Sequence, residues 1–144
     1  LAISTHSARW PVALAQLEIL DEEGVDPRRV VVGHSDSVPD PGFQLLLARR
    51  GCFVELDAVG TGTPHEQRRI VEHVLDLSAE GHLGQVLLSQ DVFLASHLTA
   101  NGGPGYGHLF DTFLDRLRGA GVGEDELTQI TVHNPARALM GDAA

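Results

Sequence analysis

The chain has 144 residues, of which 42% are hydrophobic and 21% are charged, and its formal net charge is -10. This length fits one domain, and the composition is that of a globular protein rather than a disordered or fibrous one. A strongly acidic chain is poorly suited to nucleic acid, because phosphate binding needs clustered Lys and Arg. No stretch approaches the roughly 18 apolar residues of a membrane span. We therefore expect neither a nucleic acid nor a membrane as a partner.

The single cysteine and the start of the sequence bear on where the protein works. Cys52 has no partner for an internal disulfide, which favours a reducing compartment. No basic segment followed by an apolar core opens the chain, as it would in a signal peptide, so we expect a cytoplasmic protein. The chain begins with LAIST, a pattern typical of a strand already under way. We therefore expect it to be a piece of a longer protein.

Short apolar runs alternate with amphipathic stripes along the chain. The runs predict buried strands, and the stripes, bounded by capping residues, predict helices. In chain order we predict a strand at 1–4, a helix from Pro11 to Gly24, a strand at 29–33, a helix from Pro41 to Gly51, a strand at 52–56, a long helix from Pro64, a strand at 85–89, helices at 109–117 and 124–130, and a last short helix capped by Asn134 and Pro135.

The repeated order of strand and helix predicts an α/β fold. Nearly all-apolar strands are typical of a parallel sheet that is covered on both faces. An open doubly wound sheet would carry a G-x-G-x-x-G phosphate loop after its first strand, and none is present; the glycine-rich NGGPGYG at 101–107 has no phosphate-binding Lys. A (β/α)8 barrel instead places its chemistry at the carboxyl ends of its strands, which is where this chain has its polar residues.

Polar side chains follow the predicted strands at equivalent positions. Each alone would suit a hydrogen-bonded loop or a helix cap, but their repetition favours a common site. Two imidazoles and a carboxylate are good ligands for zinc or another first-row metal. Such a metal lowers the pKa of its water to about 7, and a neighbouring Asp can accept the proton. The candidate metal ligands are His6, His34 and Asp91, with Asp91 also the candidate catalytic residue.

The segments THS, VVVGHSD, LD, LLSQD and ITVHNPARAL, in this order over almost the whole chain, resemble the phosphotriesterase family of the amidohydrolase superfamily. The stretch NGGPGYGHLF is similar to the phosphotriesterase-related branch. The resemblance implies a (β/α)8 TIM barrel, of which this chain covers about the last four βα units. Residues 1–144 would then be the C-terminal half of a single barrel domain, with the N-terminal half absent from the sequence. It also implies a homodimer.

The same resemblance implies two divalent metal ions, zinc in the first place, with Mn, Co or Fe as alternatives. His6 and His34 would bind the more exposed ion, and Asp91 would bind the buried ion and contact the bridging hydroxide. The implied activity is hydrolysis of an ester, lactone, amide or phosphoester of a small-molecule substrate by the metal-bridged hydroxide. The family's H-x-H pair and bridging lysine are missing here, since all ten basic residues are Arg. We therefore expect the isolated fragment to be inactive.

A second departure concerns proton transfer. Organophosphate-hydrolysing members of the family carry an acidic residue and a histidine where this chain has Ser37 and Ala58. This departure favours an alternative, a catalytically weak or inactive homologue that binds a small ligand. Asp36 and Asp57 remain, and they would either orient metal ligands or serve as a helix cap or solvated carboxylates.

The remaining polar and aromatic residues receive weaker assignments. Residues in or near the loop after Asp91 are candidates for a substrate pocket, because such loops shape pockets in barrels. These candidates are His97, Tyr106 and His108, and Trp10 is a further candidate for the mouth of the site. The other histidines are expected at helix surfaces or caps, without a function: His65, His73, His82 and His133.

Overall fold

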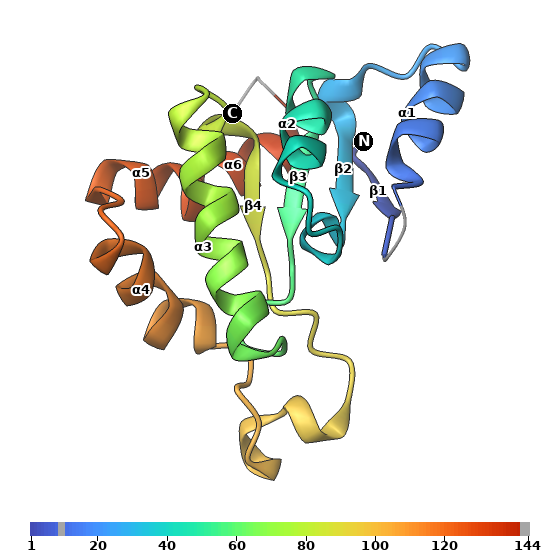
Figure 1. Ribbon diagram of the computed structural model, residues 1–144. Helices are drawn as coiled ribbons and strands as arrows, with labels where there is room; N and C mark the ends of the chain where they lie inside the picture. Colours follow the sequence, from blue (N-terminus) through green and yellow to red (C-terminus); the bar gives the residue numbers. More distant parts are fainter. Residues whose placement is uncertain (9–10, 142–144) are drawn as a thin grey trace.

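A four-stranded parallel sheet forms the centre of the molecule (Figure 1). The computed structural model describes residues 1–8 and 11–141. The strands are β1 (Ile3–His6), β2 (Val30–Gly33), β3 (Phe53–Leu56) and β4 (Val86–Leu88). The helices are α1 (Ala13–Glu22), α2 (Pro41–Arg49), α3 (Pro64–Ala79), α4 (Leu114–Gly119), α5 (Glu124–Thr128) and α6 (Asn134–Met140).

Shorter helical segments are also present in the described part of the chain. Five are single 3-10 turns, at Pro27–Arg29, Ser35–Ser37, Leu83–Gln85, Ala95–His97 and Thr99–Asn101. Two are π-helical, Leu109–Phe113 before α4 and Gln129–His133 between α5 and α6. The predicted helix at 109–117 is thus a π segment followed by an α-helix. None of the described helices is both long and apolar enough to cross a membrane.

The strands lie side by side in chain order, β1-β2-β3-β4. Ile3 pairs with Val30, Val31 with Phe53, and Val54 with Val86, all in parallel. Parallel pairing brings the carboxyl ends of all four strands to the same edge of the sheet. The predicted α/β class and the four strand–helix units are confirmed, although β1 runs to His6 rather than ending at residue 4.

The two faces of the sheet are covered differently. One face packs on α1, α2 and α3 in a single apolar core that includes Val32, Val54 and Leu56. On the other face Val31, Phe53 and Leu87 contact Ala138 of α6, and an apolar hollow of about 360 Å³ stays open beside them. Figure 1 shows α2 and α3 on the near side of the sheet and α6 behind it. The second apolar face of the sheet is therefore only partly shielded by α6, as is expected of half a barrel.

Capping residues set where two of the helices begin. Thr63 accepts a hydrogen bond from the Glu66 amide while the Glu66 side chain accepts one from the Thr63 amide, so α3 starts in a complete capping box. Asp40 caps α2 through the Gly42 amide. In contrast, α1 begins at Ala13 without any side-chain cap, two residues after the predicted start at Pro11.

Asn134 does not cap a helix, which corrects the prediction for the last segment. The backbone stays helical from α5 through the π segment into α6. The Asn134 side chain is fully buried, and its amide donates to the carbonyls of Leu83 and Val86, both at 2.8 Å. It therefore ties this helix to the start of β4, a role that depends on a contact nearly fifty residues away in the sequence.

Candidate functional site

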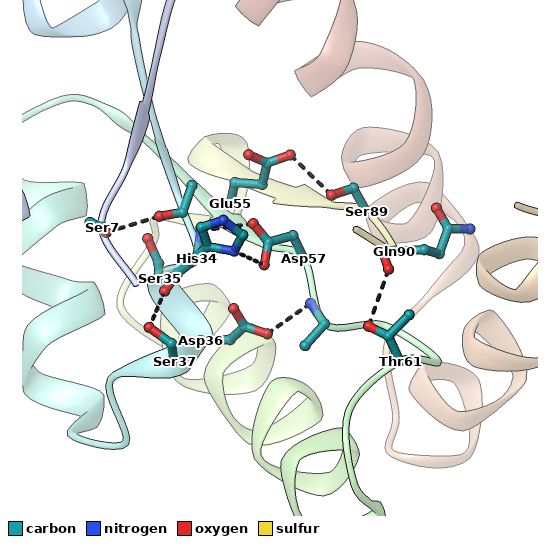
Figure 2. Close-up of polar contacts among 12 residues, drawn as sticks. Ser7, His34, Ser35, Asp36, Ser37, Glu55, Asp57, Thr61, Ser89 and Gln90 are labelled. Atoms are coloured by element: carbon teal, nitrogen blue, oxygen red, sulfur yellow. Dashed lines mark hydrogen bonds and ion pairs between the residues drawn. The ribbon is translucent and has the colours of Figure 1, made fainter. Parts of the chain in front are cut away.

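The carboxyl ends of the strands border one cleft of about 290 Å³. All three predicted ligands lie in it, His6 and His34 from β1 and the end of β2, and Asp91 from the segment after β4 (Figure 2 shows His34 and its neighbours). The lining residues are Ser4, Thr5, His6, Gly33, His34, Glu55, Asp57, Ser89 and Asp91. The sequence prediction that these ligands converge at one mouth thus agrees with the structure.

The two histidines are in direct contact. Their ring centroids lie 4.2 Å apart, with an angle of 70° between the ring planes. The sheet register causes this proximity, because His6 pairs with Gly33, the residue before His34. Ser7 secures the junction, since its hydroxyl donates to the Gly33 carbonyl at 2.9 Å. A side chain at position 33 would clash with the Thr5 carbonyl, 2.8 Å from the place of a Cβ, so Gly33 allows the strands to approach.

Asp57 fixes the orientation of His34 (Figure 2). One carboxylate oxygen accepts the His34 backbone amide at 2.8 Å, and the other lies 2.9 Å from Nδ1 of the His34 ring. When Asp57 is ionised it can only accept, so Nδ1 then carries the hydrogen and the lone pair of Nε2 is left for a ligand. Ser37 adds a hydrogen bond from its hydroxyl to the His34 carbonyl at 2.7 Å.

The electrostatics of Asp57 follow from its burial. It is 6% exposed, and Asp36 beside it is 4% exposed. Burial, followed by the negative charge of Asp36, raises the pKa of Asp57 to about 7, although its bonds with His34 act in the opposite direction. Asp36 accepts the Ala58 amide at 2.9 Å. Thus Asp57 contacts the candidate ligand His34 directly. Asp36 instead holds the Ala58 backbone and places a second negative charge beside Asp57.

His34 and Asp91 share an unusual backbone conformation. They are the non-glycine residues with positive φ in the described part of the chain, at 57° and 44°. Left-handed conformations cost about 1–3 kcal/mol and gather at functional sites, where surrounding contacts hold them. The segment leading to Asp91 is held in this way, since Thr61 donates to the Gln90 carbonyl at 3.1 Å and Ser89 donates to Glu55 at 3.0 Å.

The predicted pocket residues that the structure describes are not part of the lining of this cleft. The lining of the cleft includes none of His97, Tyr106 and His108. Tyr106 is 69% exposed, and the ring of His108 packs against Gly60. Trp10 lies outside the described residues.

His73 corrects another prediction, because it is 2% exposed rather than at the surface of α3. Neither ring nitrogen has a hydrogen-bond partner among the described residues, and burial lowers the pKa of the ring. His65 and His133 are exposed as expected. His82 is half-buried, and its Nδ1 lies 2.8 Å from the Gln85 side-chain oxygen.

The donor set of the cleft gives a partial fit to a metal centre. In the part of the chain that the structure describes, no group of three or more His, Cys, Asp or Glu side chains is arranged to hold a metal ion. The chemistry of the lining nevertheless suits a divalent cation, since two imidazoles and three carboxylates line the cleft. A metal ion bound by the paired imidazoles would need further donors to complete its coordination shell.

Glu55 and Ser89 are residues of the cleft that the sequence analysis did not single out. Both point to the same face of the sheet as Asp57 (Figure 2). The available signal was the carboxylate inside the apolar strand FVEL, because alternation along β3 sends Glu55 and Asp57 to one side. An acidic residue in an otherwise apolar strand could have been noted as a candidate for the site.

Comparisons with known proteins agree with this geometry. A model of the phosphotriesterase family matches residues 1–139. The phosphotriesterase homology protein of Escherichia coli is 36% identical over 137 residues, covering 94% of this chain and 46% of that protein. Its crystal structure, complexed with phosphate in the active site, superposes with a TM-score of 0.90. The N-acetyltaurine hydrolase of Dictyostelium discoideum is 30% identical, covering 96% of this chain and 41% of that protein.

Among solved structures, a resiniferatoxin-binding protein from Rhodobacter sphaeroides has a TM-score of 0.91 and 33% identity, covering 96% of this chain and 41% of that one. The chain therefore spans less than half the length of the relatives it matches. Its four strand–helix units correspond to about half of the barrel that these proteins form.

Proposed function

Because the chain belongs to the phosphotriesterase family, we propose that it is part of a metal-dependent hydrolase acting at the cleft between His6, His34 and Asp91. The observation that carries the proposal is the contact of the two imidazoles, with centroids 4.2 Å apart, in a cleft that also contains Asp91. The substrate would be a small molecule with an ester, lactone, amide or phosphoester bond. The hydrolase name of the Dictyostelium relative supports an amide, and the phosphate in the Escherichia coli structure supports a phosphoester.

Each candidate residue of the site would have a separate role in metal binding or proton transfer. His6 and His34 would hold one divalent ion, and Asp57 would keep Nε2 of His34 turned to it. Asp91 would hold a second ion and take the proton of the attacking water, which makes its carboxylate the general base. The ions, zinc or another first-row metal, would polarise the scissile bond and lower the pKa of that water to about 7.

The rest of the barrel would supply the missing donors. We propose that residues 1–144 form its C-terminal half, because the chain spans 46% of the Escherichia coli relative and its donor set is incomplete. The 144-residue chain alone would then be inactive. A cytoplasmic location and a homodimer belong to the same proposal, and they rest on the family resemblance.

A second candidate function is ligand binding without turnover. Ser37 occupies the place of a proton-transferring acid, yet its hydroxyl donates to the His34 carbonyl, and Ala58 has no group that moves a proton. The binding activity in the name of the Rhodobacter relative supports this alternative.

The test measures metal content per chain and hydrolysis in the full-length protein. We expect about two metals per chain, and turnover of at least one substrate in a panel of lactones, carboxylic esters, N-acyl compounds and phosphoesters. His34→Ala should lose both metal and turnover, whereas His65→Ala, which changes an exposed histidine on α3, should lose neither. A full-length protein without metal contradicts the proposal, and metal with tight ligand binding but no turnover supports the second candidate.

A further inference from the structure

Glu55 lies where the cleft and the apolar hollow of the sheet meet, and it lines both. Its neighbours in β3, Val54 and Leu56, are fully buried in the core on the helix side. Alternation therefore turns Glu55 to the opposite face, in line with Asp57 two residues further on. Among the residues that the structure describes, those that line the cleft beside it include no Arg.

The main contact is with Ser89. The Ser89 hydroxyl donates to one Glu55 oxygen at 3.0 Å (Figure 2). The other oxygen lies 3.2 Å from the place where a Cβ of residue 33 would be, so the absence of a side chain at Gly33 makes room for the carboxylate. Glu55 thus bonds to the residue that follows β4 and fits beside Gly33 at the end of β2.

Ser89 in turn controls the backbone that leads to Asp91. Its amide donates to the Leu56 carbonyl, and its carbonyl accepts the Val59 amide, both at 3.2 Å. Two residues later Asp91 adopts its left-handed conformation, with φ of 44°. A backbone in this region returns to a commoner conformation unless its neighbours restrain it. The Glu55–Ser89 hydrogen bond is such a restraint, and both of its residues line the cleft.

We propose that Glu55 is a positioning residue of this site, which holds Ser89 and thereby keeps the backbone of Asp91 in its left-handed conformation. The consequence for metal binding rests on the proposed function, because it requires Asp91 to be a ligand. The consequence for the backbone conformation of Asp91 does not require Asp91 to be a ligand. The role depends on a hydrogen-bond acceptor at position 55 rather than on a negative charge.

The test uses the full-length protein with the variants Glu55→Ala, Glu55→Gln, Ser89→Ala and the double variant with alanine at both positions. Ser78→Ala is the matched control, because Ser78 donates to Glu126 at 2.8 Å in a similar bond away from the cleft. The first readout is hydrogen exchange of the Ser89 and Val59 amides in metal-stripped protein. The second is the affinity for Zn²⁺, measured by competition with a chromogenic chelator.

We expect Glu55→Ala and Ser89→Ala to speed exchange at both amides and to weaken Zn²⁺ binding by about 10-fold, a typical effect of residues that support metal ligands. The double variant should be no worse than either single variant, since both break the same bond. Glu55→Gln should stay near wild type because its amide oxygen still accepts from Ser89, and Ser78→Ala should leave the Ser89 and Val59 amides unchanged.

Two results would overturn the inference. One is a Glu55→Gln variant as impaired as Glu55→Ala, which would mean that the charge matters and not the acceptor. The other is unchanged amide exchange in Glu55→Ala and Ser89→Ala. Failure of the proposed function would be seen separately. In that case Asp91→Ala would bind Zn²⁺ as tightly as wild type does. The exchange rates in metal-stripped protein would still decide the role of Glu55.

Discussion

His34 is restrained at three points within its own chain. Its amide and ring both bond to Asp57, and its carbonyl accepts from Ser37. These contacts offset the cost of its left-handed backbone and leave Nε2 pointing away from the carboxylate. An imidazole held in this way loses little conformational freedom when it binds a ligand, so the protein has already met that entropic cost on folding.

The restraint by Asp57 predicts the behaviour of an amide at that position. In Asp57→Asn the neutral side chain no longer polarises the His34 ring, and we expect metal affinity in the full-length protein to fall by about 10–100-fold. Competition with a chelator measures the change. Asp40→Asn is the control, because Asn caps a helix as well as Asp does and α2 should be unaffected. Equal affinity in Asp57→Asn and wild type would show that Asp57 does not orient the ligand.

Motif residues at the site were predictable, and their supporting contacts were not. His6, His34 and Asp91 follow apolar strands, a pattern visible in the sequence. The roles of Glu55 and Ser89 depend on which face of the sheet each side chain occupies and on a contact 34 residues apart. The left-handed backbone at Asp91 also could not be predicted, because Asp is common in many other turn conformations.

At the scale of elements, α3 has a stabilising capping box at its N-terminus and a destabilising histidine on its buried face. Its capping box satisfies amides of the first turn. Its buried face, however, contains His73, whose two ring nitrogens lack hydrogen bonds. A buried polar group without a partner costs about 1–3 kcal/mol. His73 was predicted at the surface because histidine is usually exposed. Its spacing from Ile70 and Leu77, however, matches that of the buried apolar residues of α3.

The burial of His73 predicts how acid affects stability. Burial, and next the charge of Arg69, lower the ring's pKa below 6.5, against the opposite effect of Asp36, Asp76 and Glu72. The unfolded chain therefore binds the proton more readily, and the free energy of unfolding falls as the pH drops through 6.5 and below. His73→Leu should remove this contribution and add about 1 kcal/mol of stability at pH 8.

Urea unfolding of the metal-stripped full-length protein at pH 5.5 and pH 8 measures the effect of His73. His65→Leu, at an exposed position of the same helix, should keep the pH dependence of wild type. A wild-type dependence that persists in His73→Leu would assign the acid sensitivity to other groups.

At the scale of the whole molecule, the sheet has two edge strands, β1 and β4, and an apolar hollow of about 360 Å³ on one face. Leu139, at its rim, is 73% exposed. Open strand edges and exposed apolar surface favour association between chains. The order of strands and helices and the barrel family were predictable, because periodicity and motifs are local. How much of the second face α6 covers could not be predicted, because that depends on how this helix packs against the sheet.

The open face predicts that the 144-residue chain by itself associates. Light scattering after size exclusion should give masses above the 15.4 kDa of one chain, increasing with concentration. Leu139→Asp, which places a charge at the rim of the hollow, should shift the distribution toward the single chain. The control Ile19→Asp changes an exposed residue of α1, 60% exposed, and should not. A stable 15.4 kDa species in the unmodified chain would contradict this prediction.

The arrangement of the strands in chain order has a consequence for synthesis on the ribosome. β2, β3 and β4 each pair with the strand made just before them, so this part of the sheet can grow strand by strand as the chain emerges. His6 and His34 can meet once β2 has paired with β1, and Asp57 can join them with β3. Asp91, the proposed general base, arrives only after β4 is in place, so it is the last of these residues to join the cleft.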